Sequence, residues 1–223
     1  MQYEIEIKAL LGSQQNVDVL LAKLKRVDDS FSLKDEQVQL NHYFINGQLA
    51  NLLQKLKPYF SAEQMKVLED ISEAAKAVSV RARQKNGKTY MVVKGSLDSE
   101  DANHSHRRME FEEQISLDIE ALDELILAAG FELEAKWSAS RKMYTFKDMT
   151  VDVMFSPGYG YVVEFEKVIS DESQIEQTRQ SLLALMRDFG VEELDSGRLG
   201  RMFKYYNENW ADYYGTEKVF AVE

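Results

Sequence analysis

The sequence contains no cysteine, only two prolines and no apolar run long enough to cross a membrane as a helix. The absence of cysteine excludes thiol catalysis, cysteine-ligated zinc and iron–sulfur clusters. Besides Pro58 and Pro157 there is no low-complexity stretch, so nothing marks a flexible linker. Residues 1–4 lack the basic and apolar regions of a signal peptide, and we therefore expect a soluble cytoplasmic protein.

Positive charge is also scarce. The chain has 27 Lys and Arg against 38 Asp and Glu, which gives a net charge of −11. An acidic surface repels the phosphate backbone of nucleic acids, which excludes them as bulk electrostatic partners. With 223 residues, of which 44% are hydrophobic, the chain can bury a sizeable core. We therefore expect a globular protein that binds neither nucleic acid nor a membrane.

Helical periodicity appears in five segments. Ser13 can cap the first helix, Pro58 ends the second, and Ser61 with Gln64 forms a capping box for the third. Glycines follow the last two, as is typical after a helix. The apolar stripes of the first three cover residues 17–24, 49–56 and 65–71, and the last two helices cover 118–129 and 173–189.

Between these helices the hydrophobic period changes to two, which is typical of strands. Asn86-Gly87 between two such segments predicts a tight hairpin. Mostly antiparallel strands with segregated helices indicate an α+β fold, and eight strands are enough to close a barrel. The predicted strands are 2–8, 38–45, 77–85, 88–95, 107–116, 132–146, 150–155 and 160–169.

The alternation gathers charged side chains on one face of these strands. A sheet with one solvated face would explain any single strand. The charged residues, however, come as Glu-x-Glu and Arg-x-Arg pairs, and the helices carry enough apolar surface to cover the other face. The charged face then points inward, where carboxylates and cations are costly unless a ligand fills the space. A metal-bound polyphosphate fits, because carboxylates bind Mg²⁺ or Mn²⁺ and Arg and Lys bind phosphate.

The order of these motifs resembles the CYTH, or triphosphate tunnel metalloenzyme, superfamily. Glu4-Ile5-Glu6-Ile7-Lys8 is similar to its E-x-E-x-K signature, and seven further motifs follow in order over roughly residues 2–190. They include Val80-Arg81-Ala82-Arg83, Val92-Val93-Lys94-Gly95, Arg108-Met109-Glu110-Phe111-Glu112, Val151-Asp152 and the strand that carries Glu164 and Glu166. The resemblance implies an eight-stranded antiparallel β-barrel, the tunnel, with flanking helices.

The resemblance also implies roles for individual residues. The metal ligands for Mg²⁺ or Mn²⁺ would be Glu4, Glu6, Asp152, Glu164 and Glu166. The triphosphate would be bound by Lys8, Arg81, Arg83, Lys94, Arg108, Lys136 and Arg141, of which Lys136 and Arg108 match the motifs less closely. The catalytic carboxylates would be Glu110, Glu112 and Asp152. The implied mechanism is metal-assisted attack on a phosphoryl group.

The chain departs from the family pattern in three places. Phe44-Ile45-Asn46 lacks the expected aspartate, and a helical insertion occupies about 48–76. We expect that insertion to pack outside the barrel, with a lid or a dimer surface as alternatives. From about 191 a helical extension, rich in aromatics that we expect to be buried, closes one end of the tunnel. Alternatively its cations, Arg198, Arg201 or Lys204, bind substrate. Residues 1–223 are thus expected to form a single CYTH-like domain.

Three functions fit this pattern. The first is hydrolysis of a linear triphosphate, such as tripolyphosphate, a nucleoside triphosphate or thiamine triphosphate. The second is a class IV adenylate cyclase, which converts ATP to cyclic AMP and pyrophosphate. The third is a non-enzymatic triphosphate sensor, which the many carboxylates argue against. We favour hydrolysis by a monomer or homodimer, because it needs only water and the tunnel residues.

Overall fold

The computed structural model describes residues 3–97 and 108–220. Its strands are β1 (Tyr3–Gly12), β2 (Ser32–Ile45), β3 (Ala77–Lys85), β4 (Lys88–Ser96), β5 (Arg108–Gln114), β6 (Glu132–Phe146), β7 (Met149–Ser156) and β8 (Gly160–Ile169). Its helices are α1 (Gln14–Val27), α2 (Leu49–Leu56), α3 (Ala62–Ala74), α4 (Ile119–Leu127), α5 (Ile175–Asp188) and α6 (Ser196–Tyr213), with a 3₁₀ turn at Glu172–Gln174.

The eight strands form one sheet in the order β1-β8-β7-β6-β2-β3-β4-β5. Six of the seven neighbouring pairs have a described register, and all six are antiparallel, so the predicted α+β fold with an eight-stranded antiparallel sheet and flanking helices is confirmed. The expected closure into a barrel is not seen. Among the described strands β1 and β5 are the two ends of the order, because each is hydrogen-bonded to a single neighbour.

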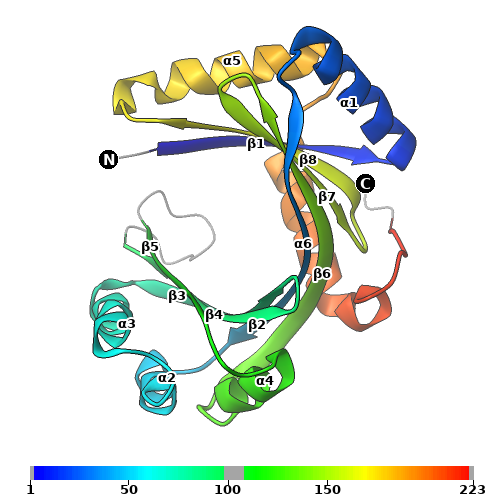
Figure 1. The fold of residues 1–223 in the computed structure, drawn as a ribbon. Coiled ribbons are helices and arrows are strands. Elements are labelled where there is room, and N and C mark those ends of the chain that lie inside the picture. Colours follow the sequence, from blue (N-terminus) through cyan, green and yellow to red (C-terminus); the bar gives the residue numbers. More distant parts are fainter. Residues whose placement is uncertain (1–2, 98–107, 221–223) are drawn as a thin grey trace. The chain divides into compact units, whose positions relative to one another are not determined.

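The chain divides into two compact units. Unit 1 consists of Met1–Val38 and Ser138–Glu223, and unit 2 of Gln39–Trp137, so β2 and β6 contribute residues to both. In unit 1, helices α1 and α5 lie along the same side of β1 and β8 (Figure 1). Leu24 of α1, Leu182 of α5 and Phe165 of β8 are among the residues of the core there. This core leaves the opposite face of β1, β7 and β8 for the charged residues.

The core of unit 2 lies between α2, α3, α4 and one face of β3, β4 and β5. Leu52, Leu68 and Leu122 are fully buried against Val80 and Met91 of the strands. The two helices in the segment 48–76 therefore pack on the sheet through their apolar stripes. A further role of that segment as a lid or dimer surface, and the single-domain organisation of the whole chain, stay predictions.

Several local signals act as predicted. Ser61 Oγ accepts from the Gln64 backbone N–H at 3.2 Å, and the Gln64 side chain accepts from the Ser61 N–H at 3.0 Å, which completes the capping box. Asn86 and Gly87 both have positive φ, 47° and 80°, as the tight hairpin between β3 and β4 requires. In α6, Tyr206 is fully buried but Tyr205 is 40% exposed, so the expectation that the aromatics there are buried is wrong for Tyr205.

Candidate functional site

Strand pairing in unit 1 brings charged side chains from three strands to one face. Lys8 of β1 pairs with Glu164 of β8, and Glu164 pairs in turn with Asp152 of β7. Glu6 shares the face of Lys8, because the two lie two residues apart on one strand. We call Glu6, Lys8, Arg141, Asp152 and Glu164 the acidic cluster, since three carboxylates meet two cations there.

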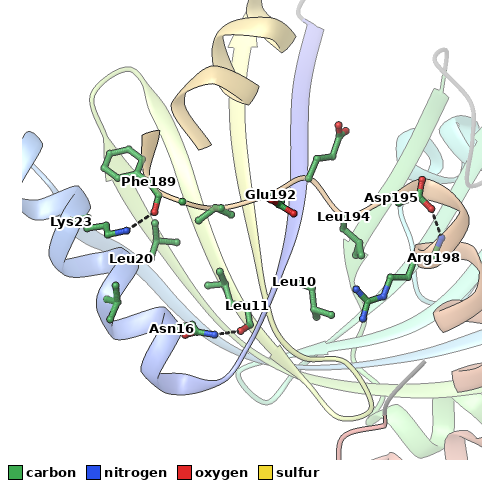
Figure 2. A pocket seen from close by; sticks show the side chains of 14 residues that line it. Leu10, Leu11, Asn16, Leu20, Lys23, Phe189, Glu192, Leu194, Asp195 and Arg198 are labelled. Carbon is green, nitrogen blue, oxygen red and sulfur yellow. Dashed lines mark hydrogen bonds between the residues drawn. The ribbon is translucent and has the colours of Figure 1, made fainter. Parts of the chain in front are cut away.

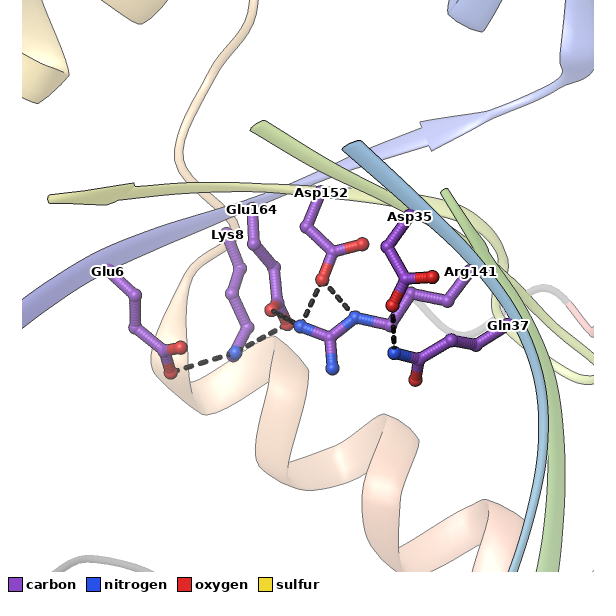
Figure 3. A network of polar contacts seen from close by, with 7 residues as sticks. All are labelled: Glu6, Lys8, Asp35, Gln37, Arg141, Asp152 and Glu164. Carbon is purple, nitrogen blue, oxygen red and sulfur yellow. Dashed lines mark hydrogen bonds and ion pairs between the residues drawn. The ribbon is translucent and has the colours of Figure 1, made fainter. Parts of the chain in front are cut away.

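The acidic cluster is a continuous chain of ion pairs, which Figure 3 shows from close by. The Lys8 ammonium donates to Glu6 at 2.8 Å and to Glu164 at 2.6 Å. The Arg141 guanidinium donates to Asp152 Oδ2 through two nitrogens, and it lies 3.8 Å from Glu164 Oε2. The chain runs from Glu6, whose side chain is 42% exposed, to Asp152, whose side chain is 2% exposed.

Burial gives Asp152 an unusual electrostatic environment. Desolvation raises the pKa of its carboxyl group from 3.8 to about 6, since the opposing attraction of Arg141 is smaller and Glu164 adds repulsion. Asp152 Oδ1 is buried and has no hydrogen-bond partner among the residues that the structure describes. Desolvation lowers the pKa of Lys8, but Glu164 and Glu6 outweigh it and the net shift is upward. Asp152 is therefore a buried carboxyl group with one unsatisfied oxygen and a pKa not far below neutral pH.

The carboxylate oxygens of the acidic cluster suit a hard divalent cation as ligands, because Mg²⁺ and Mn²⁺ prefer oxygen ligands. The unsatisfied Asp152 oxygen also fits such an ion, since buried polar atoms are nearly always partnered. Within the described residues, however, no three carboxylate or histidine side chains are arranged to hold a metal. The carboxylates are instead paired with Lys8 and Arg141, so a divalent ion would compete with these cations.

Unit 2 carries a second group of charges with the opposite balance. We call Arg81, Arg83, Lys85, Lys94, Glu110 and Glu112 the cationic cluster, since four cations meet two carboxylates there. The Arg83 guanidinium donates to Glu112 and to the Asn41 side chain, both at 2.6 Å, and Lys85 also binds Glu112. Lys94 binds Glu110 at 2.9 Å. Every member projects from β3, β4 or β5.

The cationic cluster lowers the pKa of its carboxyl group Glu112, whereas the pKa of Asp152 is raised. Desolvation raises the pKa of Glu112, but Lys85, Arg83 and Lys94 outweigh it, and the net shift is below the usual value of 4.5. Arg81 lies against an aromatic ring, with its guanidinium carbon 4.4 Å from the Tyr43 ring centre. Glu112 is therefore held as a carboxylate.

Three predicted residues, Lys136, Glu4 and Arg108, lie elsewhere or are described only in part, whereas Glu166 lies on the face of the acidic cluster. Lys136 donates to Asp123 of α4 at 3.0 Å, and Asp123 also binds the buried His42 at 2.8 Å. Glu166 lies opposite Glu6 and Thr150 in the strand register. Glu4 and Arg108 lie in β1 and β5, and their side chains are outside the described part of the structure.

Sequence reasoning missed several residues around these clusters. Lys85 could have been found, because it continues the Arg-x-Arg alternation of Arg81 and Arg83 by one more step. Asn41 has no such signal, since its contact with Arg83 depends on the register between β2 and β3. Asp35 and Gln37, bonded to each other at 2.5 Å, lie in a part of β2 that was not predicted as strand. The cross-strand partner Asn41 and the exposed start of β2 were thus harder to find than charges that alternate along a strand with apolar residues.

A cavity of about 490 Å³ lies beside α1, and no residue of the acidic cluster lines it (Figure 2). Its walls come from the end of β1, from one side of α1 over residues 16–23 and from residues 189–195. Lys23 closes part of it by donating to the Phe189 carbonyl oxygen at 2.7 Å. Of all the cations considered for substrate binding, Arg198 alone lines it. The cavity therefore holds none of the residues that the CYTH resemblance implies.

Comparison with known proteins identifies the class of this chain. The CYTH domain profile matches residues 2–198, and the chain therefore belongs to the CYTH family. Among curated proteins, none matches the chain in sequence. In the part of the chain that the structure describes, no helix is long and apolar enough to span a membrane.

Solved structures share the fold at low sequence identity. A candidate adenylate cyclase from Vibrio parahaemolyticus is 16% identical with a TM-score of 0.56, and the match covers 91% of this chain and 98% of that one. The PH1012 protein from Pyrococcus horikoshii is 17% identical with a TM-score of 0.55, covering 85% and 91%. A conserved hypothetical protein from Pyrococcus furiosus is 20% identical, with the same TM-score and coverage. These likenesses support the fold alone.

Proposed function

We propose that this protein hydrolyses a linear triphosphate with the help of Mg²⁺ or Mn²⁺. The observation that carries the proposal is Asp152, a buried carboxyl group with an unsatisfied oxygen at the end of the acidic cluster. Strongly shifted acids of this kind concentrate at functional sites. Membership of the CYTH family supports the same conclusion.

We assign metal binding to the acidic cluster, with Glu6, Glu164 and Asp152 as ligands and Glu4 and Glu166 as further candidates. A bound divalent ion supplies positive charge that neutralises phosphate oxygens. Binding of that ion competes with Lys8 and Arg141 for the same carboxylates. Both cations are then available for phosphate oxygens, which agrees with the role expected for them.

We assign phosphate binding in unit 2 to Arg81, Arg83 and Lys94. Arginine suits this role, because its planar group donates two parallel hydrogen bonds to a phosphate. Arg108 remains a candidate from the family motif. The contact between Lys136 and Asp123 supports a different role for that lysine, namely anchoring α4 to β6.

In the proposed reaction a water oxygen attacks the phosphorus atom of a terminal phosphate, and the bond from that phosphorus to the bridging oxygen breaks. Asp152 accepts a proton of the water, the diphosphate leaves with the bridging oxygen and its negative charge, and the attacked phosphate is released as orthophosphate. A carboxylate with a pKa of about 6 suits this task, because general bases work best near the ambient pH. Glu110 and Glu112 are weaker candidates for the base, since Lys94 binds the first and Arg83 and Lys85 bind the second.

Product analysis tests this proposal. The protein is incubated with tripolyphosphate, ATP and thiamine triphosphate, each with Mg²⁺ or Mn²⁺, and the products are separated by chromatography. Orthophosphate release that is strongly reduced in Glu6→Gln is the expected result. Formation of pyrophosphate and cyclic AMP from ATP would contradict hydrolysis and support the adenylate cyclase alternative. That alternative uses the same phosphate-binding residues. No product from any substrate would contradict both.

Assembly and location follow as further parts of the proposal. We expect a cytoplasmic monomer or homodimer that binds a small-molecule triphosphate and neither nucleic acid nor membranes. Light scattering coupled to size-exclusion chromatography measures the assembly. A stable complex with duplex DNA at physiological salt would contradict the expected repulsion by the acidic chain.

A further inference from the structure

Two half-buried aromatic side chains lie on the charged face of unit 2. Tyr43 of β2 is directly opposite Arg81 of β3 in the strand register, so the two side chains share one face. The Trp137 ring lies 6.5 Å from the Tyr43 ring, centre to centre, with an angle of 59° between the planes. Neither residue is among those that form the apolar core of unit 2, which lies on the opposite face.

The ring pair is directly attached to the cationic cluster. The Arg81 guanidinium carbon lies 4.4 Å from the Tyr43 ring centre, and Arg81 Nε donates to Ser79 Oγ at 3.1 Å. Asn41, two residues before Tyr43 on the same face of β2, binds Arg83. Two arginines and two aromatic rings therefore occupy adjacent positions on one face of unit 2. Inorganic tripolyphosphate would use the cations but has no group that needs the rings.

We propose that Tyr43 and Trp137 form a stacking platform for the aromatic group of an organic triphosphate, a nucleobase or a heteroaromatic ring of similar size. Flat aromatic rings gain free energy by stacking on tyrosine, tryptophan and arginine planes, and they do so without a specific hydrogen-bond pattern. This inference rests on the proposed function and narrows its substrate class. The preferred substrate is an organic triphosphate, and tripolyphosphate is the poorer one.

Tryptophan fluorescence tests the platform without relying on turnover. The chain has two tryptophans, Trp137 and Trp210, and Trp210 lies in α6 of unit 1 with its ring against Tyr214. In Trp210→Phe, Trp137 is the sole reporter. We expect a β,γ-methylene analogue of ATP with Mg²⁺ to quench it, and tripolyphosphate to change it much less. Trp137→Phe, which keeps Trp210, is the matched control and should show no ligand-dependent quenching.

Kinetics supply the second measurement. In Trp137→Leu we expect the ratio of kcat/KM for ATP to kcat/KM for tripolyphosphate to fall about tenfold, the size of one lost stacking contact. Trp137→Phe and Tyr43→Phe keep an aromatic ring and should keep most of that ratio. Circular dichroism of each variant checks that the fold is retained.

The outcomes separate this inference from the proposed function. Hydrolysis of both substrates with an unchanged ratio in Trp137→Leu would leave the proposed function in place and overturn the platform. Selective quenching by the ATP analogue without any hydrolysis would support the platform and overturn hydrolysis. Equal quenching of Trp137 fluorescence by both ligands would also overturn the platform. So would the absence of quenching at a concentration of the ATP analogue that saturates the protein, as measured by calorimetry.

Discussion

The acidic cluster of unit 1 and the cationic cluster of unit 2 arise from the same two-residue alternation but differ in electrostatic character. In the first, three carboxylates meet two cations, and burial raises the pKa of Asp152 to about 6. In the second, four cations meet two carboxylates, and the pKa of Glu112 is lowered. The comparison teaches that the local ratio of charges and the burial of each group, rather than the charge pattern, decide which cluster suits a cation and which an anion.

Substitution in each cluster should give the largest effects. We expect both Glu6→Gln and Arg83→Ala to lower turnover by roughly 10² to 10³-fold, the usual loss when one electrostatic contact to a reacting group is removed. The two variants should differ in rescue. Raised Mg²⁺ or Mn²⁺ should partly restore Glu6→Gln, which loses a metal ligand, and leave Arg83→Ala unchanged. Steady-state rates across a metal titration measure the difference.

The exposed ion pair between Lys66 and Asp70 of α3 supplies matched controls. Lys66→Ala and Asp70→Asn remove the same kinds of charge outside both clusters and should keep the wild-type rate. Near-wild-type turnover in both Glu6→Gln and Arg83→Ala would show that the clusters are not the active site.

The raised pKa of Asp152 should make stability depend on pH. The folded protein keeps this proton up to about pH 6, whereas the unfolded chain releases it near 3.8. The folded state therefore binds more protons between these values, and stability falls as the pH rises through this window. A shift of this size corresponds to about 3 kcal/mol. Urea unfolding at pH 4 and 6.5, without divalent ions, should show this loss relative to Asp152→Asn; equal pH profiles would contradict it.

The same proton should compete with a divalent ion. If Asp152 is a ligand, the apparent affinity for Mn²⁺ should rise by up to tenfold per pH unit below about pH 6 and level off above it. Calorimetry in two buffers of different ionisation enthalpy should then detect proton release at pH 5.5 and almost none at 7.5. Binding with no proton release at either pH would remove Asp152 from the metal site.

The sequence predicted the fold better than it predicted the environment of each site residue. The limits of β3 and β6 agree with the predicted 77–85 and 132–146, because their apolar alternation is strong. By contrast β2 begins at Ser32, well before the predicted 38, since its first residues are exposed and mostly polar. Strand alternation also cannot reveal which side chains are buried. Val151, Asp152 and Val153 are all buried, although successive residues point to opposite faces of the sheet.

Contacts between distant segments were the other gap. The Arg83–Glu112 pair and the Tyr43–Trp137 pair each join residues far apart in sequence. Such pairs depend on register and strand order, which one sequence does not specify. The charges themselves were predictable, and their partners were not.

The smallest predicted effect concerns Glu112, for which stability should depend on pH in the opposite direction to Asp152. The cations around Glu112 lower its pKa, so its ion pairs stabilise the protein above the unfolded pKa of about 4.5 and are lost as the pH falls through the lower folded value. Glu112→Gln should therefore cost about 1 kcal/mol at pH 7, the range of partly exposed ion pairs, and less at pH 3. Urea unfolding at the two pH values measures this. If the loss of stability in Glu112→Gln instead grew on acidification, the pKa of Glu112 would be raised, as that of Asp152 is. The assignment of the acidic cluster to metal and of the cationic cluster to phosphate would then lose its electrostatic basis.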